Sequence, residues 1–363
     1  MRVLVLNGPN LDRLGLRQPE VYGHATLSDL EEQISAAGDA LGVETETVQS
    51  NHEGALIDRI NSADHDGIVI NPGALAHTSR ALADSLRSVA MPAVEVHISN
   101  IREREPWRAD SVVAESCVRS VYGRGPRGYA DAIRHLVNRA ASPGQPVRYG
   151  PHPDQIGDLR RGEGGLVVLV HGGFWRQEWE RDTMDTLAVH LAGSGYHTWN
   201  IEYRRIGAGG GWPASAHDVL MALDFTPQLG LVRNRPISVV GHSAGGQLAM
   251  WAVSRTTTNV GRFVALAPVV DLDRHAGSGL FGDAEARALL DSGAPRRVDP
   301  GEVATTLVHG KNDDMVPIDH SQGLDGPKSI EVIILETGHF ELLDPARGWS
   351  EALSDRLAPP PLK

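Results

Sequence analysis

The sequence predicts two consecutive α/β domains, joined by a short linker, in a chain of 363 residues. Three observations support this prediction. The length exceeds the usual size of one domain. Apolar runs typical of buried strands alternate with helical patterns twice, over residues 1–141 and over residues 149–363. A proline-rich stretch, SPGQPVRYGPHP, follows the last helical pattern of the first half, so we expect a linker at residues 142–148.

The first domain alternates strands and helices regularly. The expected strands are RVLVL, VETETVQS, GIVIN, AVEVHIS and a weaker segment over residues 116–122, and the expected helices are residues 28–41, EGALIDRINSA, SRALADSLRSVA and GYADAIRHLVNRAA. Ser28 and Glu31 match a capping box at the start of the first helix, and Gly42 marks its end. This alternation predicts a parallel sheet covered by helices on both faces, of the flavodoxin-like type.

The second domain repeats the alternation, with apolar runs that end in small or polar residues. The expected strands lie in LVVLVHGG, HTWNIEYRR, PISVVGHSAGG, RFVALAPVVD, TTLVHGKNDD and SIEVIILETGH. These runs predict a second, mainly parallel sheet. In such sheets ligands bind beyond the carboxyl ends of the strands, so the residues that follow strands are the candidates for function.

Composition limits the classes of partner. The formal net charge of −12 argues against a nucleic-acid backbone or an anionic membrane surface, and no stretch approaches membrane-spanning length. Cys117 is the only cysteine, which excludes an intrachain disulfide and favours a reducing compartment, so we expect a cytoplasmic protein. The strand ends of the first domain lack metal-ligand spacing and a phosphate-binding glycine loop, and we expect no metal and no other cofactor.

Polar side chains follow three strands of the first domain. They include Asn10 after the first strand, Asn71 and His77 after the third, and His97 and Ser99 at the end of the fourth. Because the carboxyl ends of parallel strands meet at one edge of a sheet, we expect these side chains to converge. A site of amide, imidazole and hydroxyl groups suits a small polyhydroxylated carboxylate.

Several stretches of the first domain match one enzyme family in order and spacing: NGPNL, LRQPEVYG, QSNHEGALID, INPGALAHTSRAL, VEVHISN, EREPWR and GYADAI. Over about residues 1–140 the chain resembles the type II 3-dehydroquinate dehydratases. The resemblance implies dehydration of 3-dehydroquinate to 3-dehydroshikimate, in shikimate or quinate metabolism. The family carries out this reaction through an enolate, without a Schiff base or a metal.

The resemblance also implies catalytic roles. Tyr22 would be the base that removes the proton next to the ketone, although a free tyrosine, with a pKa of about 10, is a poor base at neutral pH. Arg17, on the same loop, would stabilise the phenolate. Asn10 would hold a water against the enolate oxygen. His97 would donate a proton to the departing hydroxyl, with Glu95 orienting its imidazole.

Further family positions imply contacts with the substrate. The residues implied are Asn71, His77, Ile98, Ser99 and Arg108. Asp84 would reach the site of a neighbouring subunit, because the family assembles trimers into dodecamers. The loop that carries Arg17 and Tyr22 would close over bound substrate and exclude water.

The second domain contains the pattern of a serine hydrolase. GHSAG lies between a strand and a helical pattern, which is the context of a nucleophile elbow that presents Ser243. Asp313 and His339 follow later strands, in the order serine, acid, histidine that is typical of α/β-hydrolases, with Asp314 as the alternative acid. Ser243 would attack, His339 would shuttle the proton and Asp313 would orient it.

A glycine-rich turn upstream, VHGGFW, supplies candidates for an oxyanion hole. The expected donors are the backbone N–H groups of Gly173, Phe174 and Ala244. Together with GHSAGG and HF, this turn resembles the kynurenine formamidase and esterase branch of the α/β-hydrolases, over about residues 147–355. The resemblance implies a small-molecule ester or amide as substrate and does not identify which one.

The sequence therefore predicts a fusion of a type II dehydroquinase with an α/β-hydrolase. Two alternatives remain. The first domain could act on an amino or other analogue of dehydroquinate, or it could be an inactive core that displays a formamidase or esterase. The intact pair of Tyr22 and Arg17 counts against the inactive core.

Overall fold

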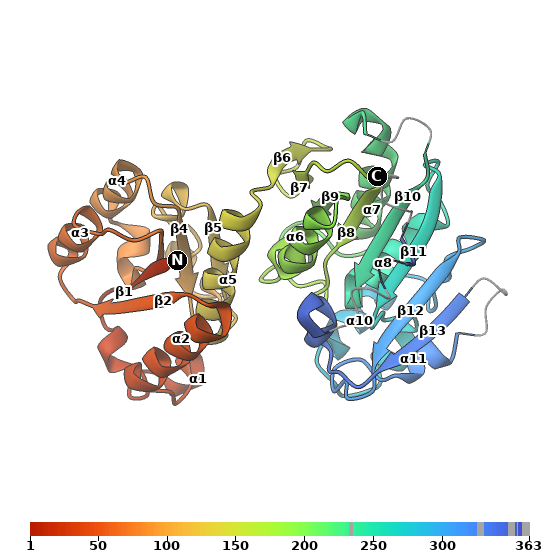
Figure 1. The fold of residues 1–363 in the computed structure, drawn as a ribbon. Helices are drawn as coiled ribbons and strands as arrows, with labels where there is room; N and C mark the ends of the chain where they lie inside the picture. The colour runs from red at the N-terminus through yellow and green to blue at the C-terminus, as the bar shows by residue number, and fades with distance from the viewer. Residues whose placement is uncertain (232–234, 325–329, 348–352, 354, 358–363) are drawn as a thin grey trace. The chain divides into compact units, whose positions relative to one another are not determined.

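The computed structural model describes residues 1–231, 235–324, 330–347, 353 and 355–357 (Figure 1). The chain divides into two compact units, Met1–Ala140 and Ala141–Lys363. Each unit is built on its own sheet, here called sheet A and sheet B.

Sheet A is a five-stranded parallel sheet with the strand order β2-β1-β3-β4-β5. Its strands are β1 Arg2–Asn7, β2 Glu44–Gln49, β3 Gly67–Asn71, β4 Ala93–His97 and β5 Arg119–Tyr122. Asn7 and Asn71 pair at the carboxyl ends of β1 and β3, so the loops that follow these strands start side by side. This topology confirms the predicted flavodoxin-like sheet.

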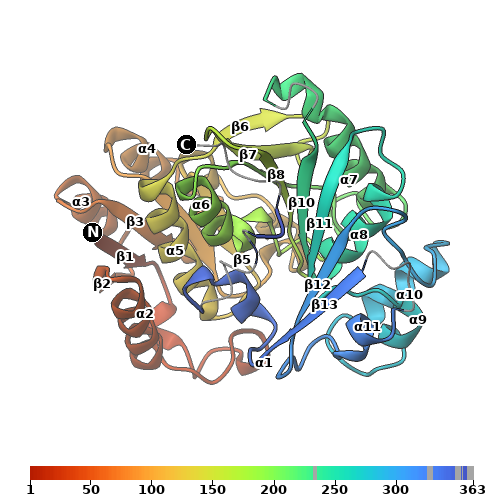
Figure 2. The same ribbon diagram turned by 45° about the vertical axis from the view of Figure 1, so that its right-hand side comes forward.

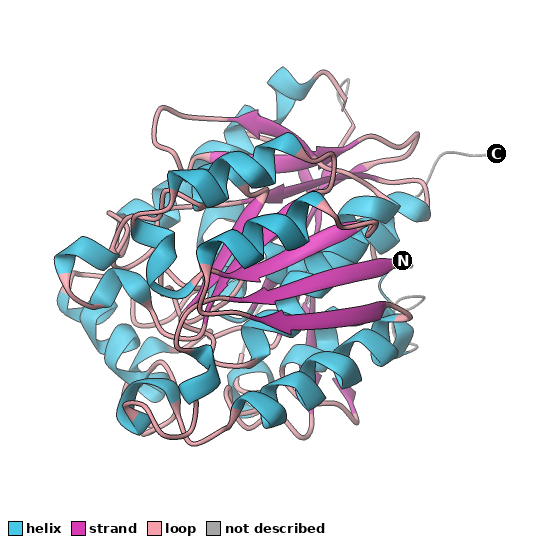
Figure 3. Cartoon of the chain, turned by 90° about the vertical axis from the view of Figure 1, so that its left-hand side faces the viewer, coloured by secondary structure: helices cyan, strands magenta, loops and turns pink. Residues whose placement is uncertain are grey.

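Helices cover both faces of sheet A, as Figure 3 shows. They are α1 Pro19–Tyr22, α2 Leu27–Leu41, α3 Glu53–Asn61, α4 Arg80–Ser88 and α5 Arg127–Ala141. Side chains of β1 alternate between the faces: Val3 belongs to the core under α2 and α5, and Leu4 to the core under α3 and α4. Successive strand residues point to opposite faces, so a run of apolar residues is buried on both sides.

The N-terminus of α2 differs from the prediction. The capping box is formed by Thr26 and Asp29, so the predicted box of Ser28 and Glu31 is wrong. Thr26 has an extended backbone; its Oγ1 accepts from the Asp29 N–H at 3.2 Å, and Asp29 Oδ2 accepts from the Thr26 N–H at 2.8 Å. Both orphan donors are thereby satisfied two residues earlier than expected. Gly42, with φ 66°, terminates the helix as predicted.

Sheet B has eight strands in the order β13-β12-β11-β10-β8-β9-β7-β6. They are β6 Gln145–Arg148, β7 Ile156–Arg160, β8 Leu166–Val170, β9 His197–Ile201, β10 Ile237–His242, β11 Val260–Leu266, β12 Thr305–Gly310 and β13 Ile330–Leu335. The pairings from β9 to β13 are parallel, whereas β7 is antiparallel to both β9 and β6. This mainly parallel sheet, with a strand–turn–helix at β10, confirms the predicted α/β-hydrolase fold.

The helices of the second unit are α6 Asp185–Gly193, α7 Ala214–Phe225, α8 Ser243–Val253, α9 Leu272–His275, α10 Asp283–Asp291 and α11 Asp319–Gln322. Residues of α7, α8 and α10 share one hydrophobic core on sheet B, and those of α6 belong to a second core; the elements can be followed in Figure 2. Every residue of α8 is buried. The segment that begins with Ser243 is therefore held rigidly at the centre of the domain.

Part of the predicted linker is instead sheet. Residues 145–148 form β6, which pairs with β7, and neither strand is among those predicted from the sequence. Both strands are partly polar, and Pro146 lies at the sheet edge, where a missing N–H is tolerated. β7 pairs with the distant β9, and β6 joins the sheet by pairing with β7; local periodicity reports neither pairing. Across the described segments, no helix is long and apolar enough to cross a membrane.

Candidate functional site

The first candidate site is a pocket beyond the carboxyl ends of β1, β3 and β4. The predicted residues that line it are Asn10, Arg17, Tyr22, Asn71, His77, His97, Ile98, Ser99 and Arg108. They come from segments up to 98 residues apart, between Asn10 and Arg108. The parallel topology of sheet A therefore gathers these side chains as expected.

Two arginines surround the phenol of Tyr22. Arg104 Nη1 donates a hydrogen bond to the Tyr22 hydroxyl oxygen at 2.5 Å. The guanidinium carbons of Arg17 and Arg104 each lie 5.4 Å from the centre of the Tyr22 ring. Two cationic side chains thus contact one phenol. Sequence reasoning assigned only Arg17 to this role, although Arg104 stands in the quoted motif EREPWR.

The loop that carries these groups has a constrained backbone. Asn10 has φ 67° and its N–H donates to Asn51 Oδ1 at 2.8 Å. Gly15 has φ 79°, and a Cβ there would lie 3.0 Å from the carbonyl oxygen of His24. Glycine is therefore required where the loop folds back on itself. These contacts explain how a short loop keeps Arg17 and Tyr22 at one pocket.

A fully buried carboxylate supports His97. Glu95 Oε1 lies 3.1 Å from His97 Nε2. Ser111 Oγ donates to Glu95 Oε1 at 2.5 Å, and Ser120 Oγ donates to Oε2 at 2.9 Å. Burial alone would raise the pKa of Glu95, but the contacts with His97 and the two serines outweigh it and hold the pKa below its usual value. Glu95 is thus an ionised group that can orient the imidazole, and Ser111 and Ser120 are supports that sequence reasoning missed.

A chain of hydrogen bonds fixes the amide of Asn71. Asn71 Nδ2 donates to the Tyr129 hydroxyl at 2.9 Å, and that hydroxyl donates to Asn7 Oδ1 at 2.6 Å. Asn71 Oδ1 accepts from the Gly73 N–H at 3.2 Å. Burial raises the pKa of Tyr129, so its hydroxyl keeps the proton that it donates. The orientation of the Asn71 amide at the pocket is therefore fixed by the Tyr129 hydroxyl and the Gly73 backbone.

His77 and Arg108 also line the pocket. The ring of His77 stacks with that of His97 at a centroid distance of 6.5 Å, and its Nδ1 lies 2.8 Å from the backbone oxygen of Asp110. Arg108 Nε donates to Glu105 at 2.8 Å, and its guanidinium carbon lies 4.0 Å from the centre of the Trp107 ring. This arginine is oriented before any ligand binds.

Asp84 is the predicted substrate contact that the structure does not bring to this pocket. It lies on α4, its side chain is 82% exposed, and it pairs with Arg87 at 3.2 Å. The predicted role at a neighbouring subunit's site stays a prediction.

The second candidate site lies at the junction of β10 and α8. Ser243 has φ 52°, a strained value for a residue other than glycine. A Cβ at Gly245 would lie 2.0 Å from the carbonyl oxygen of His171, and one at Gly241 would lie 2.8 Å from the Cα of Gly246. Only glycine permits this close approach, and the resulting sharp turn is that of a nucleophile elbow.

An acid and a histidine meet beside the elbow. His339 Nδ1 lies 2.7 Å from Asp313 Oδ2. Asp313 Oδ1 accepts from the backbone N–H groups of Met315 and Val316 at 2.9 and 2.8 Å, whereas Asp314 is exposed. Burial would raise the pKa of Asp313, but hydrogen bonds, first from His309 and then from His339, lower it well below its usual range. The geometry thus favours Asp313 over Asp314 as the acid.

Ser243 and His339 each present an unused polar atom. Ser243 Oγ and His339 Nε2 are both buried, and neither has a hydrogen-bond partner within the described part of the chain. The structure thus brings Asp313 and His339 into contact but forms no Ser243–His339 hydrogen bond. Catalytic hydrogen bonds often tighten only when substrate binds.

The predicted oxyanion donors lie on two segments that pack together. Gly173, Phe174 and Trp175 have φ values of 108°, 56° and 59°, a run of three left-handed residues. A Cβ at Gly172 would lie 2.9 Å from the Cβ of Ser243. The turn with Gly173 and Phe174 therefore packs against the helix start that carries Ala244. Backbone N–H groups on such a turn can face a developing oxyanion.

Aromatic rings surround this second site. Phe174 stacks on His339 with a centroid distance of 6.3 Å and contacts Phe281 at 4.6 Å. Trp179 stacks on Phe340 at 5.5 Å. An apolar surrounding strengthens electrostatic interactions within a site because it excludes water. For the described residues, no group of three or more His, Cys, Asp or Glu is placed to hold a metal ion.

Comparisons with known proteins separate the same two regions. Residues 1–137 match the family model described as dehydroquinase class II, and residues 158–271 match the BD-FAE family model. The 3-dehydroquinate dehydratase 2 of Corynebacterium efficiens is 52% identical over 143 residues, which cover 38% of this chain and 99% of the relative.

Solved structures also resemble each region. The crystal structure of a type II dehydroquinase from Butyrivibrio crossotus is 46% identical, with a TM-score of 0.37, and covers 38% of this chain and 97% of that one. A bacterial heroin esterase is 20% identical, with a TM-score of 0.48, and covers 63% of this chain and 89% of that one. The chain covers 99% of the Corynebacterium efficiens relative at 52% identity, and residues 1–137 match the family model. The chain therefore belongs to the type II dehydroquinase family.

Proposed function

We propose that the first domain dehydrates 3-dehydroquinate to 3-dehydroshikimate through an enolate. The observation that carries this proposal is the Tyr22 hydroxyl, held by Arg104 beside Arg17 in the pocket that also contains His97. The relative from Corynebacterium efficiens, a 3-dehydroquinate dehydratase, supports the same reaction.

The first step is removal of a proton. Tyr22, as phenolate, takes the proton from the carbon next to the ketone, and the two arginines stabilise the phenolate beforehand. The electron pair of the broken C–H bond moves into the enolate. Asn10 holds a water against the enolate oxygen, which lowers the energy of the developing charge.

The second step expels water. The enolate collapses, the bond to the leaving hydroxyl breaks, and His97 supplies the proton that turns this hydroxyl into water. Ionised Glu95, 3.1 Å from His97 Nε2, orients the ring. Tyr22 and His97 therefore act as the base and the acid of one dehydration.

Binding uses the remaining residues of the pocket. We assign Asn71, His77, Ile98 and Ser99 to the carboxylate and nearby hydroxyls, and Arg108 to the far hydroxyls. The support is that Asn71, His77 and Arg108 are each held by neighbours in the structure before a ligand binds, so little side-chain entropy is lost on binding.

We further propose that the chain assembles through its first domain into trimers and dodecamers, with Asp84 reaching a neighbouring subunit's site. The exposed position of Asp84, away from its own pocket, supports this assignment. We also propose a cytoplasmic location, which the single cysteine, Cys117, supports.

For the second domain we propose hydrolysis of an ester or amide by Ser243, His339 and Asp313. Ser243 Oγ attacks the acyl carbon while His339 takes its proton and then passes it to the leaving group. Water releases the acyl group in a second cycle. The short contact between Asp313 and His339 supports these roles, and the turn with Gly173 and Phe174, with Ala244, would hold the oxyanion.

One experiment tests both proposals in the full chain. Absorbance of the conjugated enone follows dehydration of 3-dehydroquinate, and release of p-nitrophenol from a p-nitrophenyl ester follows hydrolysis. We expect Tyr22→Phe to lose only the first activity and Ser243→Ala only the second. Absence of dehydration in the wild type would reject the proposal for the first domain, and absence of hydrolysis would reject that for the second.

A further inference from the structure

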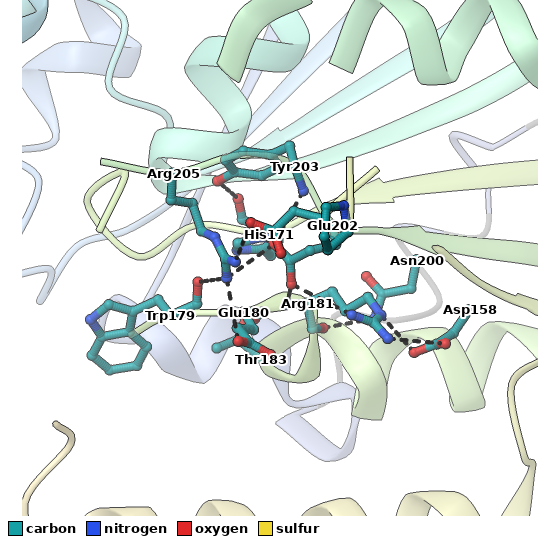
Figure 4. A network of polar contacts seen from close by, with 12 residues as sticks. Asp158, His171, Trp179, Glu180, Arg181, Thr183, Asn200, Glu202, Tyr203 and Arg205 are labelled. Atoms are coloured by element: carbon teal, nitrogen blue, oxygen red, sulfur yellow. Dashed lines mark hydrogen bonds and ion pairs between the residues drawn. The ribbon is translucent and has the colours of Figure 1, made fainter. Parts of the chain in front are cut away.

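We define residues 171–175 as the oxyanion turn. A buried polar network contacts this turn through His171 (Figure 4). We propose that Glu202 is a positioning residue of the hydrolase: it holds His171, and with its neighbours Tyr203 and Arg205 it clamps the oxyanion turn against the nucleophile elbow. This inference rests on the proposed hydrolase function.

Glu202 follows β9 and is 2% exposed. Its Oε1 lies 2.7 Å from His171 Nε2 and 3.2 Å from Arg205 Nη1. Its Oε2 accepts from the Arg181 backbone N–H at 3.0 Å. Burial would raise the pKa of this carboxyl, but the charges of Arg205 and His171 hold it far below its usual value. Glu202 is therefore an acceptor at both oxygens.

The contacts of His171 require two ring protons. Nε2 faces the Glu202 carboxylate and Nδ1 lies 2.7 Å from the carbonyl oxygen of Gly172. Both partners only accept, and an imidazole donates from both nitrogens only in its charged form. His171 thus forms a buried ion pair with Glu202, and its ring ties the backbone of Gly172 to that pair. Charge-assisted hydrogen bonds of this kind are the strong ones.

Tyr203 holds the backbone of His171. Its hydroxyl donates to the carbonyl oxygen of His171 at 2.8 Å, and its ring stacks on the His171 ring at 4.4 Å. That carbonyl oxygen also lies against Gly245, where a Cβ would come within 2.0 Å. The start of the oxyanion turn is therefore pressed between Tyr203 and the elbow of Ser243.

Arg205 supports the turn indirectly, through Trp179. It is 1% exposed, and its Nη1 donates to the backbone oxygen of Trp179 at 3.0 Å. Trp179 packs on Gly173, where a Cβ would lie 2.1 Å from the Cβ of Trp179. Glu202 pairs with this arginine and with His171, so one carboxylate joins both supports.

The turn needs such support because its backbone is strained. Phe174 and Trp175 have positive φ values of 56° and 59°, which are unfavourable for residues with a side chain. Strained backbone persists only where surrounding contacts over-determine it. Loss of the clamp would let the N–H groups move away from the oxyanion, and a shift of about 1 Å can lower a rate about 100-fold.

The test is Glu202→Gln in the full chain, with Asp158→Asn as the matched control. Asp158 is a carboxylate of the same network, and it pairs with Arg181, through Nε at 2.8 Å. We expect Glu202→Gln to lower kcat for a p-nitrophenyl ester about 10- to 100-fold, with KM within about twofold, because an oxyanion forms only after binding. Labelling of Ser243 by a fluorophosphonate should slow by a similar factor. Asp158→Asn should leave both rates unchanged.

Two further measurements separate positioning from folding. Tyr203→Phe removes only the hydroxyl that holds His171, and we expect a smaller loss of kcat without loss of folded protein. Nitrogen-15 NMR should detect two protected ring protons on His171 in the wild type and in Asp158→Asn, and only one in Glu202→Gln. A single ring proton in the wild type would overturn the ion pair.

The remaining outcomes are equally decisive. Full kcat in Glu202→Gln, or an equal loss in Asp158→Asn that follows a lowered melting temperature, would overturn the positioning role. If the wild type neither hydrolyses the ester nor reacts with the fluorophosphonate, the proposed hydrolase fails first and this inference falls with it. Wild-type hydrolysis that Ser243→Ala abolishes keeps the proposed function in place whatever Glu202→Gln does.

Discussion

Arg104 Nη1 donates to the hydroxyl of Tyr22 at 2.5 Å, across 82 residues of sequence. This contact brings a second cation to the phenol, beside Arg17. The base of the proposed dehydration is therefore supported by two loops, and each can be tested separately.

Replacing Arg104 should impair dehydration. Arg104→Met removes the hydrogen bond and the charge, so we expect kcat to fall about 10²- to 10⁴-fold, the range of a general base. Arg104→Lys should recover part of the rate because it restores the charge. Arg102→Met is the control: Arg102 is exposed and stacks over Tyr122 at 4.4 Å, outside the pocket lining. Initial rates with 3-dehydroquinate compare the three variants with the wild type. A normal rate in Arg104→Met would reject the role of Arg104 in dehydration.

Glu95 should make the stability of the first domain depend on pH. Its pKa is lower in the folded than in the unfolded state, where it is about 4.3. Such a group stabilises the fold above the unfolded pKa and loses this contribution as pH falls through the folded pKa. We therefore expect the melting temperature to differ most between wild type and Glu95→Gln at pH 7, and less below about pH 4. Calorimetry of both proteins checks this, and a constant difference would contradict it.

The acid of the hydrolase can be identified by paired substitutions. Asp313→Asn should lower kcat for ester hydrolysis about 10⁴-fold, because an amide no longer stabilises the charged imidazole of His339. Asp314→Asn should leave hydrolysis unchanged, since Asp314 is exposed. Dehydration serves as the internal control in both variants. A larger loss in Asp314→Asn would reverse the assignment.

Asp84 offers a test of assembly by mixing chains. If Asp84 acts at a neighbour's site, Asp84→Ala and Tyr22→Phe chains should each be nearly inactive as dehydratases. Mixed assemblies, formed by co-expression, should regain activity because some sites combine an intact Tyr22 with an intact Asp84. Light scattering after size exclusion should give multiples of three chains. Activity of Asp84→Ala alone, or a monomer, would reject the proposed assembly.

Gly245 should be intolerant of a side chain. A Cβ would lie 2.0 Å from the carbonyl oxygen of His171, and relieving such a clash costs about 1–3 kcal/mol or more. We expect Gly245→Ala to lose ester hydrolysis and lower the melting temperature of the second domain, while dehydration continues. Gly193→Ala is the control, because nothing lies within 4 Å of a Cβ at that exposed position. Equal behaviour of the two variants would contradict the close packing of elbow and turn.

Sequence patterns located the elements whose signal is local. The apolar run of β8 is buried at all five positions, and Gly42 ends α2, as periodicity and end signals indicated. The capping box was misplaced because Thr26–Asp29 and Ser28–Glu31 both have the required spacing. The extended backbone of Thr26 decides between them, because it places the Thr26 side chain and N–H where both can bond to Asp29.

The sequence by itself determined the two domains, the family of the first, and the order of chemical groups along the chain. These follow from periodicity and motif spacing, which act over a few residues. Only the tertiary structure decided that Arg104 reaches Tyr22, that Ser111 and Ser120 hold Glu95, and that β6 joins sheet B. It also placed Glu202 on His171, 31 residues away. Such contacts form where strand pairing and folding bring separate segments of the chain together, and no local pattern records which side chains will meet there.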